Sequence, residues 1–248
     1  TAGAEFLGYA WQVTEQVALL EQRYLDRPPS RRLLGVSAQH YSFVIDAFVR
    51  MVKSSGAAEY EFSLRETRTW DIIEDVRTLR SELGILYRND FNRNVIDKLL
   101  RDSGLAFHPL FLAEPHIFIS RKNPLAARER ITLADLADSP RLTFDQGANN
   151  SFYFAEEILS TLSSKQEIRV SDRATIFNLM IGLDGYTIST GIISDDLDPQ
   201  IVAIPLDVDE RIEIGWIGHS AFPLTEQAQR YLAELRAVVA GFGVALLG

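Results

Sequence analysis

Apolar positions in the first 27 residues are spaced alternately four and three apart. They are Phe6, Ala10, Val13, Val17, Leu20 and Tyr24. This spacing is typical of a helix that lies along a second helix. Pro28 and Pro29 follow, and proline ends a helix because it has no N–H to donate. We predict a linker and dimerisation helix over residues 1–27, with a helix packed on its own domain as the alternative.

Beyond Pro29, short apolar runs alternate with segments of helical periodicity. The pattern predicts strands over 31–37, 60–64 and 83–87 and helices over 38–53 and 70–80. Strands that alternate with helices in this way form a parallel sheet covered by helices.

A second series of elements follows. We predict strands over 106–112, 116–120, 141–144, 167–170, 186–189, 201–206 and 211–217, and helices over 133–137, 151–162, 173–183 and 223–240. Two α/β units of this size predict two lobes with a ligand cleft between them. The last strand needs a sheet to join. We therefore assign residues 31–111 plus 212–248 to the first lobe and 112–211 to the second.

Composition excludes several classes of function. The chain of 248 residues has no cysteine, so disulfides, zinc–cysteine sites and thiol catalysis are excluded. Its net charge of −9 repels phosphates and argues against direct binding of nucleic acid by these residues. The start lacks the basic and apolar stretches of a signal peptide. The apolar tail from Ala237 has 12 residues, fewer than the roughly 20 that span a bilayer.

Four stretches follow one another over nearly the whole chain: residues 1–10 (TAGAEFLGYA), 64–73 (LREx₂TxxII), 123–136 (NPLA followed by ITLADL) and 182–188 (GLDGYTI). Together and in this order they resemble LysR-type transcriptional regulators. The resemblance implies a periplasmic-binding-protein-like α/β fold of two Rossmann-like subdomains, preceded by a long linker helix. Two departures concern the ligand: residues 81–85 lack the aspartate common in that strand, and 186–191 (YTISTG) are more polar than usual.

The resemblance also implies partners. A winged helix-turn-helix domain would precede Thr1 and bind operator DNA, and the chain would form a homodimer or homotetramer in the cytoplasm, with no membrane contact. A small-molecule effector would bind between the lobes. The competing class is a solute-binding protein of a transporter, which shares the two-lobed fold.

Polar side chains recur where strands turn into helices. They are Ser37, Gln39, Thr67, Thr69, Gln146, Asn149 and Thr190. Helix N-termini favour anions, so we predict an effector site for a small carboxylate, amino acid or oxyanion. Helix capping is the alternative role for each residue. The resemblance points to Ser37, Thr69 and Gln146 as effector contacts.

Signatures of catalysis and of cofactor binding are missing from the sequence. The four histidines never occur at metal-ligand spacing, and there is no G-x-S-x-G elbow, P-loop or G-x-G-x-x-G turn. We therefore expect no enzyme activity, no catalytic residue, no metal and no cofactor.

Overall fold

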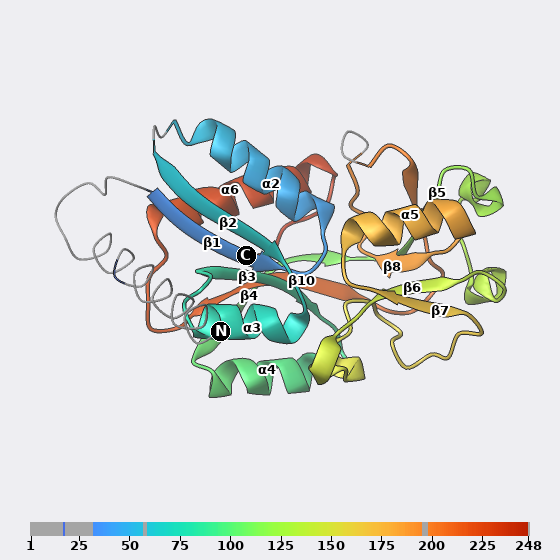
Figure 1. Ribbon diagram of the computed structural model, residues 1–248, viewed down its shortest axis with the longest axis horizontal. Coiled ribbons are helices and arrows are strands. Elements are labelled where there is room, and N and C mark those ends of the chain that lie inside the picture. Colours follow the sequence, from blue (N-terminus) through green and yellow to red (C-terminus); the bar gives the residue numbers. More distant parts are fainter. Residues whose placement is uncertain (1–16, 18–31, 57–58, 195–197, 248) are drawn as a thin grey trace, which may run out of the picture.

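A computed structural model describes residues 17, 32–56, 59–194 and 198–247. These residues fold into two α/β lobes that lie side by side (Figure 1). Of the predicted 1–27 helix the structure describes only Val17, which is helical and 46% exposed. The other predicted seam residues lie outside the described part: Phe6, Ala10, Val13, Leu20 and Tyr24.

The first lobe is built on a five-stranded sheet in the order β2-β1-β3-β10-β4. Its strands are β1 (Arg32–Ala38), β2 (Tyr60–Glu66), β3 (Leu83–Arg88), β4 (Leu105–Ala113) and β10 (Ile212–His219). β1 pairs in parallel with β2 and β3, whereas β10 runs antiparallel to both β3 and β4. The prediction that the last strand returns to the first sheet is confirmed.

Helices cover both faces of this sheet (Figure 1). They are α2 (Ser42–Ser54), α3 (Thr69–Arg77), α4 (Arg93–Asp102) and α6 (Glu226–Gly241). α2 and α6 pack together on one face, and α3 and α4 cover the other. The central strand β3 is therefore buried from Leu83 to Tyr87 and is charged only at its last residue, Arg88, as expected for a strand covered on both sides. Gly84 in β3 leaves room for Ile72 and Ile217, because a Cβ there would lie 2.7 and 2.6 Å from their side chains.

Helix α4 was absent from our sequence prediction. Asn89 and Asn92 open it by exchanging hydrogen bonds, each side-chain oxygen accepting from the backbone N–H of the other at 2.8 and 3.1 Å. Ile96 and Leu100 then bury a narrow stripe against the first lobe. Their i, i+4 spacing is a helical signal that the sequence does contain.

The second lobe is assembled from two smaller sheets. Its strands are β5 (His116–Ser120), β6 (Arg141–Phe144), β7 (Glu167–Val170), β8 (Thr187–Ser189) and β9 (Ile201–Pro205). The antiparallel sheet has the order β8-β5-β9, and the parallel pair β6-β7 approaches it through a bridge between Arg141 and Tyr186. Helix α5 (Arg173–Leu183) packs on this layer through Ile176 and Met180.

Short 3-10 turns replace longer helices in the second lobe. They are η1 (Pro124–Ala127), η2 (Leu133–Leu136), η3 (Gly147–Asn149) and η4 (Phe152–Phe154). The helix predicted over 133–137 is present as η2, and Thr132 and Asp135 form a capping box at its start.

The predicted helix over 151–162 is wrong, since only η4 is helical there. The guanidinium of Arg141 donates to the carbonyls of Ile158, Leu159 and Leu162 at 3.1–3.2 Å. Those carbonyls are thus held by a side chain from β6, and Leu159 has a left-handed backbone (φ 56°) that interrupts a right-handed helix. The apolar spacing of this segment arises from inward-facing side chains of the loop, such as Phe154 and Ile158, which are buried without a helix.

Two connecting segments join the lobes, one between β4 and β5 and one between β9 and β10. They contact each other, since Leu206 N–H donates to the Pro115 carbonyl at 2.9 Å and Arg211 forms an ion pair with Glu114 at 2.9 Å. A single cluster of buried side chains also continues from the first lobe into the second and includes Phe111 and Ile117. The lobes therefore share close-packed side chains, and this packing is lost if they move far apart.

Candidate functional site

The turn between β1 and α2 faces the second lobe. The predicted helix begins four residues later than expected, at Ser42, so Gln39, His40 and Tyr41 form a turn. Gln39 is fully buried and fixed inside the first lobe. Its amide donates to Thr69 Oγ1 at 2.6 Å, and its carbonyl oxygen accepts from Tyr87 N–H and Tyr41 O–H, both at 2.9 Å.

Gln146 and Asp145 reach this turn from the second lobe. Gln146 Oε1 accepts from the Thr69 N–H at 3.1 Å. Arg68 donates to the Asp145 carbonyl at 3.1 Å and to its carboxylate at 2.7 Å. The N-terminus of α3 is therefore occupied by side chains of the other lobe, and the predicted residues Gln39, Thr69 and Gln146 form one hydrogen-bonded chain.

His40 and Glu156 form a second contact between the lobes. Glu156 Oε2 accepts from the His40 N–H at 3.0 Å and contacts His40 Nδ1 at 2.8 Å, and both side chains are only 4% exposed. The imidazole also stacks on Phe144 with a centroid separation of 3.9 Å. Burial lowers the pKa of His40, but Glu156 and Glu66 raise it by more, against a smaller lowering by Arg173, so the pKa lies above its ordinary value of 6.5.

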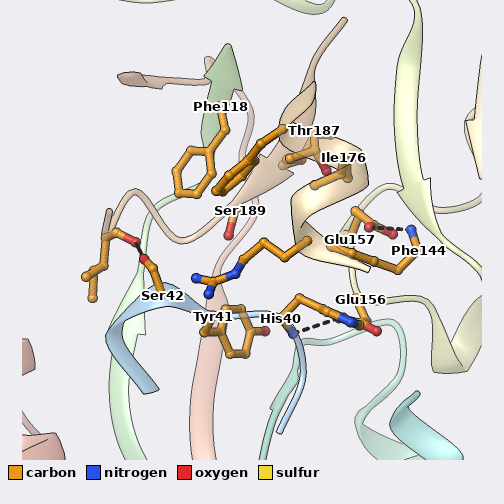
Figure 2. Close-up of a pocket in the computed structure, with 14 residues that line it drawn as sticks. His40, Tyr41, Ser42, Phe118, Phe144, Glu156, Glu157, Ile176, Thr187 and Ser189 are labelled. Carbon is orange, nitrogen blue, oxygen red and sulfur yellow. Dashed lines mark hydrogen bonds and ion pairs between the residues drawn. The ribbon is translucent and has the colours of Figure 1, made fainter. Parts of the chain in front are cut away.

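A hollow lies beside this ion pair, between the lobes (Figure 2). His40, Tyr41 and Ser42 line it from the first lobe, and Figure 2 shows Phe118, Ile176, Thr187 and Ser189 across from them. It encloses about 470 Å³ including its open mouth, but side chains leave room for about one water molecule. In this arrangement the lobes are closed upon each other, and a larger ligand requires them to separate.

Two polar atoms of residues that line the hollow are buried and have no hydrogen-bond partner among the described residues. They are Thr187 Oγ1 and Arg173 Nη1. Arg173 forms two ion pairs, from Nε to Glu66 Oε1 at 3.5 Å and from Nη1 to Asp198 Oδ2 at 4.0 Å. Neither of these contacts is a hydrogen bond. Helix α2 also begins without a side-chain cap. A guanidinium with a buried Nη1, a buried hydroxyl and an uncapped helix N-terminus together suit the oxygens of a small anion.

Glu157 separates this hollow from a second one of about 400 Å³ on the far side, which Arg141 and Arg169 line. Its carboxyl accepts from the Phe144 N–H at 3.0 Å (Figure 2) and is 3% exposed as a residue. Burial, reinforced by neighbouring Glu156, raises the pKa of Glu157 from 4.5 to about 8. At neutral pH Glu157 is therefore mostly protonated.

This shift predicts that stability depends on pH. The folded state holds the Glu157 proton up to pH about 8, whereas the unfolded chain loses it near pH 4.5. The folded state thus binds more protons across this window, and the free energy of unfolding falls as pH rises, by roughly 2 kcal/mol between pH 6 and 8. His40 adds to this fall, because its stabilising charge is complete below pH 6.5 and is lost as pH rises through its raised pKa.

Urea unfolding of Glu157→Gln at pH 6, 7 and 8 measures the effect. The variant is expected to show a much flatter pH profile than the parent, with the smaller fall due to His40 remaining. The matched control is Glu167→Gln, whose carboxylate is 39% exposed and which should follow the parent. Parallel profiles for parent and Glu157→Gln would contradict the assignment.

The remaining predicted residues lie elsewhere. Ser37 is buried in a network with Asp75 and Ser81 at 2.7 and 2.8 Å, beneath α3. Thr67 extends β2 pairing through its N–H to the Ala38 carbonyl. Asn149 lies in η3, and Thr190 accepts from the Ile192 N–H at 3.4 Å. Effector contact by any of these residues stays a prediction.

Sequence reasoning missed the charged members of the site: Glu156, Glu157 and Arg173. Their sequence context resembles that of ordinary surface charges, and only the fold brings them under cover. Thr187 and Ser189 did have a signal, because they make residues 186–191 unusually polar for this strand.

Comparison with known proteins identifies the family. The model of the LysR substrate binding domain matches residues 57–240. The chain belongs to the LysR substrate-binding domain family. A search of the curated proteins found no match.

Solved LysR-family structures share this fold. The effector-binding domain of QuiR in complex with shikimate has a TM-score of 0.55 at 15% identity and covers 84% of this chain and 96% of that one. The regulatory domain of MetR from N. meningitidis has a TM-score of 0.58 at 13% identity, with coverage of 87% and 98%. The reduced OxyR regulatory domain from Pseudomonas aeruginosa has a TM-score of 0.59 at 14% identity, with coverage of 84% and 98%. The two-lobed LysR fold is thus confirmed.

Two further observations concern the described residues of this LysR domain. None of their helices has the length and apolar character needed to cross a membrane. They also contain no group of three or more histidine, aspartate or glutamate side chains placed to hold a metal ion.

Proposed function

We propose that this chain is the effector-sensing part of a LysR-type DNA-binding transcriptional regulator, and that a small metabolite binds between its lobes. The observation that carries the proposal is the hollow between the lobes, where Arg173 Nη1 and Thr187 Oγ1 are buried without hydrogen-bond partners among the described residues. Unsatisfied buried polar atoms are costly, and a ligand with acceptor oxygens would satisfy both.

The ligand class that fits is a small carboxylate, amino acid or oxyanion. The uncapped N-terminus of α2 and the Arg173 guanidinium favour negative charge, while Phe118 and Ile176 provide an apolar wall. QuiR, which shares the fold, was solved with shikimate, and we extend to this chain only the expectation of a small organic ligand.

Ligand binding would act through the relative orientation of the lobes. We divide the chain into a linker helix (1–27), a first lobe (31–111 plus 212–248) and a second lobe (112–211). A ligand shifts their arrangement only by binding one arrangement better, which typically amounts to roughly 1–3 kcal/mol of coupling. The shared core makes a rotation about β4 and β10 more favourable than a wide hinge opening.

The rest of the protein would translate this rotation into control of transcription. A winged helix-turn-helix domain ahead of Thr1 would bind operator DNA, and pairing through residues 1–27 would give a homodimer or homotetramer in the cytoplasm. The alternative, a solute-binding protein of a transporter, is less favoured because the matching family and the similar structures are those of transcriptional regulators. The same comparison favours a regulatory role over an enzymatic one.

A thermal-shift screen tests the proposal. A ligand specific to the folded state stabilises it by roughly 2.7 kcal/mol at a hundredfold excess over its dissociation constant. The panel contains monocarboxylates, amino acids and inorganic oxyanions. We expect a hit whose shift is lost in Thr187→Val, which keeps the size and removes the hydroxyl, and kept in the exposed control Thr161→Val. A ligand that raises the melting temperature of both variants equally would have to bind elsewhere, which would contradict the proposed site.

A further inference from the structure

Beside the unpaired donors of the hollow, two further donors at the lobe boundary already hold a carboxylate of the protein itself. Glu156 Oε2 takes both the backbone N–H and the ring nitrogen of His40, at 3.0 and 2.8 Å. Its other oxygen accepts from Gln146 Nε2 at 3.2 Å. Glu156 comes from the loop of the second lobe, and His40 precedes the uncapped helix α2 of the first.

The burial of this contact distinguishes it from a surface ion pair. Both side chains are 4% exposed, and an exposed pair contributes little because water screens it. A buried carboxylate with three hydrogen bonds needs each of them, since loss of any one leaves a charged acceptor uncompensated. Glu156 thus links the two lobes at the point where the ligand of the proposed function would link them.

We propose that Glu156 is an internal ligand of the cleft, a built-in carboxylate that closes the lobes and that an incoming acidic ligand replaces at His40. Glu156 therefore sets the specificity of the site, because a ligand must supply an acidic group of its own to release it. Because Glu156 must first leave, the apparent affinity for the ligand equals the intrinsic affinity multiplied by the fraction of molecules in which Glu156 is already displaced. This inference rests on the proposed function for the identity of the cleft.

Chemical rescue tests the role of Glu156. Glu156→Ala removes the carboxylate and leaves space at the His40 N–H that formate or acetate can enter. We expect the variant to melt several degrees below the parent and to regain much of the loss with increasing formate, in a saturable manner. Sodium chloride at equal ionic strength should restore none of it. The matched control Glu167→Ala, which removes a half-exposed carboxylate of the same lobe, should show no formate effect.

The outcomes separate this inference from the proposed function. Formate acting no better than chloride on Glu156→Ala, or equally on the parent, would overturn the internal-ligand role. Rescue would support it even if no metabolite shifts the parent, in which case the proposed function alone fails. If Glu156→Ala does not fold, the isosteric Glu156→Gln is measured by NMR titration of the His40 ring. A pKa lower than in the parent supports the contact, and an unchanged pKa overturns it.

Discussion

Replacing Arg173 with methionine is expected to weaken the binding of small carboxylates to this domain by about 100-fold. Arg173 Nη1 is buried at the hollow and unpaired by any hydrogen bond within the described chain, so it is the charged donor that a carboxylate would engage. Loss of a desolvated charged partner costs roughly 2–5 kcal/mol, and a factor of 100 lies within that range at about 1.4 kcal/mol per tenfold.

Calorimetric titration with the best carboxylate of the thermal-shift panel measures this effect. Arg173→Lys keeps the charge but loses the planar fork, so its affinity should fall between those of the parent and Arg173→Met. The matched control is Arg169→Met, because Arg169 is 51% exposed and pairs only with Glu167 among the described residues. An Arg173→Met domain that folds and binds as tightly as the parent would exclude Arg173 from the site.

Arg141→Met is expected to lower the free energy of unfolding by about 3 kcal/mol, because three carbonyls lose a hydrogen bond to a charged group and each such bond contributes roughly 1.5–3 kcal/mol. Arg141 is 5% exposed and holds the carbonyls of Ile158, Leu159 and Leu162. Its charge also lowers the pKa of Glu157, against the larger effect of burial. Without it, the loop that carries Glu156 and Glu157 loses its anchor.

Urea unfolding gives the stability change, and limited proteolysis gives its location. Cleavage of Arg141→Met should begin within residues 151–162 before the rest of the chain is attacked. Arg169→Met, one strand away on β7, should stay within about 0.5 kcal/mol of the parent because its ion pair is exposed. An unchanged loop in Arg141→Met would show that the carbonyls find other donors.

The sheet of the first lobe could be predicted from the sequence because its strands are either mostly apolar runs, as in β3, or alternate apolar and polar residues, as in β2. β3 is buried along nearly its whole length, and such a run leaves little choice of structure. Helix α4 also has a helical signal in the sequence, the i, i+4 pair Ile96 and Leu100. The loop over 151–162 could not be predicted, because its carbonyls are held by Arg141. This residue lies in β6, outside the loop.

The candidate site likewise contains some residues that could be predicted from the sequence and others that could not. Gln39, Thr69 and Gln146 were predicted from their places at strand-to-helix turns, and the structure joins them in one chain of hydrogen bonds. Ser37 was predicted at the same turn as Gln39 but lies within β1 and points toward Asp75, a partner 38 residues away that no local pattern reveals. The charged residues Glu156 and Arg173 could not be predicted, because they join the site only through the packing of the second lobe against the first.

Binding of a small acidic ligand between the lobes can be tested directly. The most direct measurement is a ¹H–¹⁵N NMR titration with the best carboxylate of the panel, which follows the backbone amides and the arginine Nε–H signals. We expect saturable shifts with one dissociation constant at His40, Ser42, Thr187 and the Arg173 side chain. Shifts confined to the second hollow around Arg169, or spread over the surface without saturation, would contradict it.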